Sequence, residues 1–325
     1  RILSANRDKF SGKVIFTWQP GEEIGYGARI IIDEGAIVYG YIEARNAEHV
    51  RIAGHGIVCG SCNTHDFQHR KSLLFMKNCR DIEVEGIFFR GSPSWSLCFS
   101  ECEGLRMRDV KEVCWMRNSD GIDLCNTRNV RIEDCFLRNY DDNISLKNYP
   151  ARSGISTSNV RMTGCTLWAD CAHNIVVGPE SGETLPMENV EFDGIEILEA
   201  RETAWPWRGA FAVMGSDDGT FRNVVFRDIC IDHTRGGQMF AVELCPYRTM
   251  GRAVQNVSIE NVRFLGDTTQ LPPSTIKGLD ADHPIDGIGL HNLRINGRRL
   301  TPRTLPQRVE TNDFIRRLRV NKKTQ

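Results

Sequence analysis

The chain has 325 residues, of which 40% are hydrophobic and 26% charged, so it can bury a substantial core and is too long for a small module. Its formal net charge of −1 gives no overall field that would favour nucleic acid or an anionic membrane. No apolar run approaches the roughly eighteen residues of a transmembrane helix. We therefore expect neither nucleic acid nor a membrane as a partner.

Twelve cysteines raise the alternative of a secreted disulfide framework, but their placement favours buried thiols. Most of them follow or end short apolar runs, as Cys79, Cys135 and Cys165 do, and a free cysteine behaves as a small hydrophobic residue. Cys59 and Cys62 are the closest pair, three residues apart, and no second pair of cysteines follows at that ligand spacing. We predict no metal site and no cofactor.

One phrase recurs along the middle of the chain. It consists of an Asn or Cys at a bend, two or three alternating apolar residues, a second short bend and another apolar pair, and it appears in seven places between residues 78 and 265. Alternation is typical of strands. The cysteines at 79, 102 and 125 are 23 residues apart, and the later Asn-Val pairs, which begin at 129, 159, 189, 223 and 256, follow at steps of 30, 30, 34 and 33. Periods of this length indicate a solenoid with loops inserted on one side.

A right-handed parallel β-helix fits this repeat better than a leucine-rich repeat, whose Leu-x-x-Leu-x-Leu frame is absent. We predict an all-β chain with one β-helix domain over residues 1–297, of roughly nine or ten coils. Residues 266–287 read as a long loop. Residues 298–325 read as a basic C-terminal tail whose charges are a solvated face.

Three aspartates stand at the ends of two successive coils. Asp120 belongs to the segment 118–123 (Asn-Ser-Asp-Gly-Ile-Asp), and Asp141 and Asp142 belong to 140–147 (Tyr-Asp-Asp-Asn-Ile-Ser-Leu-Lys). Asp120 and Asp141 are 21 residues apart, about one turn, and neighbouring coils stack roughly 4.8 Å apart. We therefore expect Asp120 beside Asp141, with Asp142 on the same face if the strand bends there.

Clustered carboxylates raise the pKa of at least one member, which then suits a general acid, while ionised neighbours can activate water. Hydrolysis of a glycosidic bond needs this division of labour. A calcium site or a solvated acidic edge is the plainer alternative, although calcium would need more oxygen donors at close spacing.

These two segments resemble the polygalacturonase family, glycoside hydrolase family 28, and more distantly the dextranases and isopullulanases of family 49. The family phrases are Asn-Thr-Asp-Gly-Ile-Asp and Gly-Asp-Asp-Cys-Ile-Ala-Ile-Lys, and weaker similarities occur at 33–40, 52–57 and 92–97. The resemblance implies that Asp141 is the general acid, that Asp120 and Asp142 hold and deprotonate the attacking water, and that the anomeric carbon is inverted. It also assigns Asn118 and Lys147 to substrate binding.

Two further family motifs are altered in this chain. The Gly-His-Gly motif corresponds to 172–174, where His173 remains without its glycines and is assigned a catalytic role close to Asp141. The Arg-Ile-Lys motif, whose cations grip a galacturonate carboxylate, corresponds to the stretch that begins at Arg208, and we align its two cations with Phe211 and Val213. A neutral or differently charged sugar is therefore expected. We assign Arg208 to substrate binding, with Trp205 and Trp207 as stacking platforms, and Trp115 and Trp168 are further candidates.

The sequence thus predicts an inverting glycoside hydrolase whose partner is a carbohydrate substrate. A lyase or epimerase on the same fold and a non-catalytic carbohydrate-binding β-helix are the alternatives. The sugar, the linkage, endo or exo action, the oligomeric state and the compartment stay open. On the compartment, the family's members are mostly secreted, while unpaired cysteines favour a reducing interior.

Overall fold

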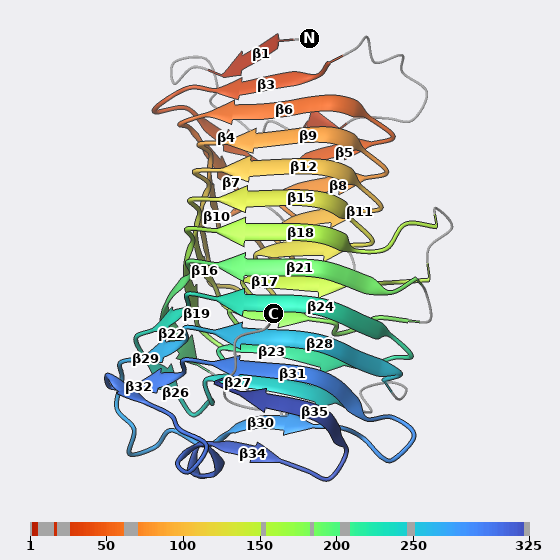
Figure 1. Cartoon of the computed structure of the whole chain (residues 1–325). Helices are drawn as coiled ribbons and strands as arrows, with labels where there is room; N and C mark the ends of the chain where they lie inside the picture. The colour runs from red at the N-terminus through yellow and green to blue at the C-terminus, as the bar shows by residue number, and fades with distance from the viewer. Residues whose placement is uncertain are drawn as a thin grey trace.

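The computed structural model describes residues 2–5, 16–17, 27–61, 71–150, 154–182, 185–201, 209–245 and 251–321. Within these residues nearly every element is a strand, and the one helix is the short 3-10 turn η1 (Leu305–Gln307). The strands form three sheets, here called A, B and C, and the chain passes through them in the repeating order C, A, B (Figure 1). The coils wind in a right-handed sense from β1 down to β34. The predicted right-handed parallel β-helix is confirmed.

Sheet A contains, in spatial order, β1 (Ile2–Ala5), β3 (Arg29–Ile32), β6 (Glu48–Gly54), β9 (Arg80–Glu85), β12 (Glu103–Arg108), β15 (Arg128–Glu133), β18 (Ser158–Thr163), β21 (Met187–Asp193), β24 (Thr220–Arg227), β28 (Ala253–Glu260), β31 (Ile285–His291) and β35 (Ile315–Val320). Sheet B contains β4 (Ile37–Tyr39), β7 (Ile57–Cys59), β10 (Phe88–Arg90), β13 (Lys111–Cys114), β16 (Phe136–Asn139), β19 (Thr166–Ala169), β22 (Glu196–Arg201), β25 (Cys230–Ile231), β29 (Arg263–Phe264), β32 (Arg294–Ile295) and the antiparallel β33 (Arg298–Arg299), with β26 (Thr234–Arg235) also on β22. Sheet C contains β2 (Phe16–Thr17), β5 (Ile42–Arg45), β8 (Leu74–Lys77), β11 (Leu97–Ser100), β14 (Ile122–Cys125), β17 (Ile144–Lys147), β20 (Ile175–Val177), β23 (Phe211–Gly215), β27 (Phe240–Leu244), β30 (Ser274–Lys277) and β34 (Val309–Thr311).

The recurring Asn-Val phrase forms the strands of sheet A. Its asparagines adopt positive φ angles, for example 58° at Asn129 and 53° at Asn159, a conformation that Asn tolerates better than most residues. Their amides form a ladder along the helix, in which Asn159 Nδ2 donates to Asn129 Oδ1 over 3.1 Å and Asn189 Nδ2 donates to Asn159 Oδ1 over 3.2 Å. Asn223 and Asn256 continue it. The steps of 30, 30, 34 and 33 residues therefore join equivalent positions of successive coils.

One continuous hydrophobic core runs through the coils from Ile32 to Val309. The inward side chains of the three sheets stack on their counterparts one coil away, as in the stacked rings of Phe192 and Phe226, whose centroids are 5.3 Å apart. The sheets need no covering helices or second domain to bury this core, because each coil packs its apolar residues against those of its two neighbours. None of the described residues forms a helix long or apolar enough to span a membrane.

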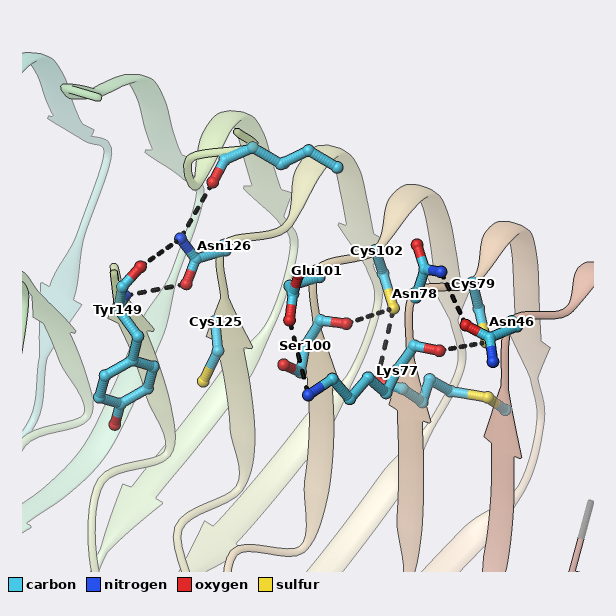
Figure 2. Close-up of polar contacts among 12 residues, drawn as sticks. Asn46, Lys77, Asn78, Cys79, Ser100, Glu101, Cys102, Cys125, Asn126 and Tyr149 are labelled. Atoms are coloured by element: carbon cyan, nitrogen blue, oxygen red, sulfur yellow. Dashed lines mark hydrogen bonds and ion pairs between the residues drawn. The ribbon is translucent and has the colours of Figure 1, made fainter. Parts of the chain in front are cut away.

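Ten of the eleven cysteines that the structure describes are buried free thiols, and Cys171 is half-buried. Figure 2 shows the corner between sheets C and A, where Cys79 and Cys102 lie on neighbouring coils and each thiol donates to a backbone carbonyl two residues earlier, over 3.3 Å in both cases. Cys125 is not the next member of this stack, because it pairs with Ser100 in sheet C. The second step of 23 residues therefore joins inequivalent positions, and Thr127 follows Cys102 instead.

The ends of the helix differ from the expected loop and tail. The stretch 266–287 contains β30, and residues 309–320 supply β34 and β35, which pair with β30 and β31. Sheet A thus has twelve strands and sheet C eleven, more than the nine or ten coils expected. The recurring phrase underestimates the number because the first and last coils lack it.

Candidate active site

A cavity of about 210 Å³ opens where three strands of sheet C begin. Most of its lining comes from the segments before β14, β17 and β20 and from the turn after β20, and the rest comes from the segment before β11, the end of β17 and β23. The lining residues are Trp95, Asn118, Asp120, Asp141, Asp142, Lys147, Ala172, His173, Pro179, Glu180 and Met214. Six of these were assigned to the site from the sequence. We refer to it below as the carboxylate cavity.

The three aspartates meet because neighbouring coils place equivalent residues one strand apart. Ile122 pairs with Ile144, and the amide of Gly121 donates to the carbonyl of Asp142 over 2.8 Å. The residue level with Asp120 is therefore Asp142, not Asp141 as the 21-residue spacing suggested. The bend at 140–143 nevertheless brings Asp141 into the same cavity. The backbone amide of Asp142 donates to Asp141 Oδ1 over 3.2 Å, which fixes that carboxyl.

Asp141 and Asp142 are adjacent in sequence but have opposite pKa shifts. Burial, together with the charge of Asp142, raises the pKa of Asp141 to about 7. Burial acts against the charge of Asp142 too, but there the hydrogen bonds and the charge of His173 prevail and hold the pKa of Asp142 below its usual value. Asp142 Oδ1 accepts both from the backbone amide of His173 and from its ring Nδ1, each over 3.0 Å. His173 thus contacts Asp142 directly rather than Asp141.

Lys147 is the centre of the charge network behind the aspartates. Its Nζ lies 2.9 Å from Asp123 Oδ1, 3.4 Å from Asp120 Oδ2 and 3.4 Å from Glu180 Oε2. The ammonium also lies 3.5 Å from the centroid of the Trp95 ring, a cation–π contact. Burial opposes its charge, yet Asp123 and Asp120 raise the pKa of Lys147 well above its usual value. Lys147 therefore balances a buried group of carboxylates rather than standing free for a substrate.

Asp120 and Asp123 are both almost fully buried in this network. Burial and the charge of Asp123 raise the pKa of Asp120 well above its usual value, although Lys147 opposes the shift. Burial raises the pKa of Asp123 to about 6 against the same opposing ammonium. Asp123 belongs to the motif at 118–123, in which no feature of the sequence separates its role from that of Asp120.

Five lining residues were not assigned from the sequence, and two of them, Glu180 and Trp95, have a charged or aromatic side chain. Glu180 lies in the turn after β20, where its Oε2 accepts a hydrogen bond from the Tyr149 hydroxyl over 3.0 Å. Trp95 belongs to the segment 92–97 that carried part of the family resemblance, so a signal for it existed. Asn118, with a φ angle of 62°, lies on the lining as expected.

The predicted stacking residues have different outcomes. Trp205, Trp207 and Arg208 lie outside the described residues. Trp115 and Trp168 belong to the sheet B side of the helix, where Arg90 and Arg138 cover their rings at 5.7 and 4.5 Å from the centroids, and neither residue lines the cavity. Among the described tryptophans, Trp95 is the one on the cavity lining.

Phe211 and Val213, with which the sequence analysis aligned the two lost cations, do not face the carboxylate cavity. Both side chains point into the core and are fully buried, because alternate residues of β23 face inward. The outward positions are Ala212 and Met214, which belong to a second small apolar cluster with Val176, Ala241 and Cys245. No cation occupies either position, so the inference drawn from the missing cations is unchanged.

The described residues contain no group of three or more His, Cys, Asp or Glu placed to hold a metal ion. The cationic neighbours of the aspartates are the ammonium of Lys147 and the imidazole of His173. The arrangement can donate a proton from one carboxyl and accept one at another.

The model of the family described as glycosyl hydrolases family 28 matches residues 41–298. The chain belongs to glycosyl hydrolase family 28. It is 24% identical over 230 residues to the polygalacturonase QRT2 of Arabidopsis thaliana, covering 67% of this chain and 48% of that protein. It is 21% identical over 278 residues to a putative galacturan 1,4-alpha-galacturonidase C of Aspergillus niger, covering 74% and 63%. The chain thus spans about half the length of QRT2.

Solved structures share the fold of this family 28 chain at low sequence identity. The family 28 exopolygalacturonase of Yersinia enterocolitica superposes with a TM-score of 0.68 at 13% identity, covering 100% of this chain and 73% of that one. The polygalacturonase of Erwinia carotovora gives 0.67 at 14%, covering 99% and 87%. Dex49A from Penicillium minioluteum gives 0.53 at 16%, covering 90% and 54%. These likenesses confirm the β-helix, and the match to the family model confirms the family resemblance.

Proposed function

We propose that this family 28 glycoside hydrolase cleaves its substrate with inversion at the anomeric carbon. The observation that carries the acid and base roles is the placement of two adjacent carboxyls in one cavity with opposite pKa shifts, raised to about 7 at Asp141 and lowered at Asp142 where His173 contacts it. Inversion is what membership of the family implies for these roles. A pair of titratable groups with separated pKa values is the arrangement that acid and base roles require.

Asp141 is then the general acid that protonates the leaving oxygen. Asp142, held ionised by His173, takes the proton from the attacking water. The raised pKa of Asp120 suits it to holding that water rather than deprotonating it. Lys147 and Glu180 position this set from behind.

The substrate is a poly- or oligosaccharide whose sugar at the cleavage site carries no carboxylate. Four carboxyl groups line the carboxylate cavity, and Lys147, its one cationic side chain among the described residues apart from His173, already contacts three carboxyls. A uronate placed there would meet like charges without an available cationic partner among the described residues. Polygalacturonate, which the names of the relatives suggest, therefore fits the described part of this cavity poorly.

The test is a glycan panel that includes neutral pectin side chains and polygalacturonate, assayed by reducing ends. We expect hydrolysis of a neutral linkage, with the inverted anomer formed first in proton NMR. Asp141→Asn should reduce turnover by a factor of about 10² to 10⁴ while the circular dichroism spectrum is unchanged. A retained anomer or full activity of Asp141→Asn would remove these roles. An unsaturated product would identify a lyase, and tight binding without any product would identify a binding module.

A further inference from the structure

The outer face of sheet A carries a groove of about 710 Å³ that is larger than the carboxylate cavity and lies on another sheet. It runs along the helix axis across β12, β15, β18 and β21, which Figure 1 shows side by side. The asparagine ladder lines it, together with a row of exposed arginines, Arg106, Arg131 and Arg161, which we call the arginine row.

The arginine row places three like charges directly opposite one another. Arg106 pairs with Arg131 and Arg131 with Arg161 in the parallel register, so their Cα atoms lie on adjacent strands roughly 4.8 Å apart. Like charges at opposite positions destabilise a sheet. Arg161 has acidic neighbours in Glu191 and Asp193, at 3.6 and 3.4 Å, but neither Arg106 nor Arg131 has a hydrogen-bond or ion-pair partner among the described residues.

The neighbouring rows of the same sheet mix the two signs. In one of them Arg108 lies 3.0 Å from Glu85, and further along Arg227 contacts Glu260 over 3.3 Å. In the other, Arg128 lies 2.9 Å from Glu103. Among the described residues, Arg106 and Arg131 therefore lack the acidic contact that the arginines named in the neighbouring rows have, although Glu83 and Glu191 flank the row on the next strands. Both arginines line the groove, whose lining also includes Asp81 and Glu191.

The other wall supplies further donors. Each ladder amide has two N–H groups, and the ladder bond to the preceding asparagine uses one of them. Guanidinium groups and amide N–H groups at a regular spacing along a groove match the carboxylates of a linear chain, since arginine binds carboxylates by paired charge-assisted hydrogen bonds.

We propose that this groove, the arginine groove, is a non-catalytic binding site for an acidic polysaccharide chain, which lies along the helix axis with its carboxylates on the arginine row. The groove lining includes no aromatic side chain, which disfavours single-stranded nucleic acid and the stacking of neutral sugar rings. A recessed groove also suits a thin chain better than a flat membrane. The proposal does not depend on which bond the carboxylate cavity cleaves.

The probe is polygalacturonate, used as an anionic chain in affinity electrophoresis and in titrations at low salt. All proteins carry Asp141→Asn, so that any cutting of the probe is slow on the timescale of the binding measurement. The test variant is R106Q/R131Q/R161Q. The matched control is R298Q/R299Q/R303Q, which removes three exposed arginines from the basic C-terminal segment and changes the net charge equally.

We expect the arginine-row variant to bind polygalacturonate at least about tenfold more weakly, the control to stay within about twofold, and salt to weaken the remaining difference. Thermal unfolding of both variants should confirm that they fold. Equal binding by the row variant and the parent would overturn the proposal, as would an equal loss in the control. Comparable row-dependent binding of neutral dextran, duplex DNA or anionic phosphatidylserine vesicles would also overturn it, because the groove would then not select an acidic polysaccharide.

Discussion

At the scale of single residues, the carboxylate cavity shows how adjacent side chains acquire different chemistry from different partners. Asp141 is buried beside another carboxylate, whereas Asp142 accepts two hydrogen bonds from His173. The bend between them turns both carboxyls into one cavity, although consecutive residues of a straight strand would face opposite ways. The bend between Asp141 and Asp142 therefore allows two adjacent residues to serve as the acid and the base in one cavity.

This difference predicts the pH profile. The acid must be protonated, so kcat/KM should fall as pH rises through the Asp141 pKa of about 7, and on the acidic side it should fall only below the lowered pKa of Asp142. His173→Ala removes the ring contact that lowers the Asp142 pKa, so the acidic limb should move to higher pH. The basic limb should stay near its position. A shift of the basic limb alone would show that His173 acts on Asp141 instead.

Lys147 supplies a second prediction. Lys147→Met leaves Asp120, Asp123 and Glu180 without their shared cation, so the free energy of unfolding should fall by about 3–5 kcal/mol at pH 8. The folded pKa of Asp123, already above its unfolded value, would rise further, and such a group destabilises increasingly as pH rises above about 4. The loss measured by urea unfolding should therefore shrink towards pH 5.

The control for Lys147 is Lys111→Met, which removes an exposed lysine paired with an exposed aspartate, Asp109. Exposed pairs contribute about 0–1 kcal/mol, so this variant should unfold much like the parent. If both lysine variants lost equal stability, the buried network would not be what holds this end of sheet C together.

Site residues that belong to short sequence motifs can be predicted from the sequence. Site residues whose position is set by the conformation of an inserted turn cannot. Asp120, Asp141, Asp142 and Lys147 are recognisable because their spacing follows the coils. Glu180 is not, because its place depends on the turn after β20, whose length no repeat specifies. The role of Lys147 in neutralising carboxylates depends on its burial and its ion-pair partners. Neither of these can be predicted from the spacing of residues along the sequence.

At the scale of strands and turns, the asparagine ladder explains why one residue type recurs at one corner. A positive φ is costly for most side chains, and the amide also bonds to the neighbouring coil. Asn159→Ala should therefore lower the free energy of unfolding by about 2–3 kcal/mol. Asn159→Gly should lower it by about 1 kcal/mol less, because glycine adopts a positive φ angle without steric cost. Urea unfolding of the two variants measures the difference. Equal losses would mean that the side-chain bonds alone matter.

Around the aspartates, the register between strands of successive coils differs by one residue from the register that the sequence predicted. The alternating pattern correctly places strands in sheets A and B, but the number of residues in a bend sets which ones align across coils. That is why Asp142, not Asp141, is level with Asp120. The same shift of one residue turns a side chain to the opposite face of a strand, so Phe211 and Val213 lie in the core while Ala212 and Met214 face outward.

At the scale of the whole molecule, the helix presents different chemistry on different sheets. The beginning of the sheet C strands holds carboxylates around one buried ammonium, while sheet A carries the arginine groove. Each surface repeats with the coil, so a row of like residues arises wherever successive coils place the same residue type in register. A solenoid can in this way offer two separate linear surfaces to an extended chain.

β34 and β35 cover the C-terminal end of the hydrophobic core that the structure describes. β34 and β35 pair with β30 and β31, whose Ile276, Ile285 and Ile288 are almost fully buried. A chain that stops after Arg308 would expose these side chains and leave the strand edges unpaired, and an open edge promotes association. We expect Tm to fall by about 5 °C or more in calorimetry and self-association to appear in size-exclusion chromatography. Arg317→Gln, which removes only the exposed ion pair to Asp286, should change neither. A truncated chain that stayed monomeric with an unchanged Tm would show that the basic segment is a tail after all, and not the last coil of the helix.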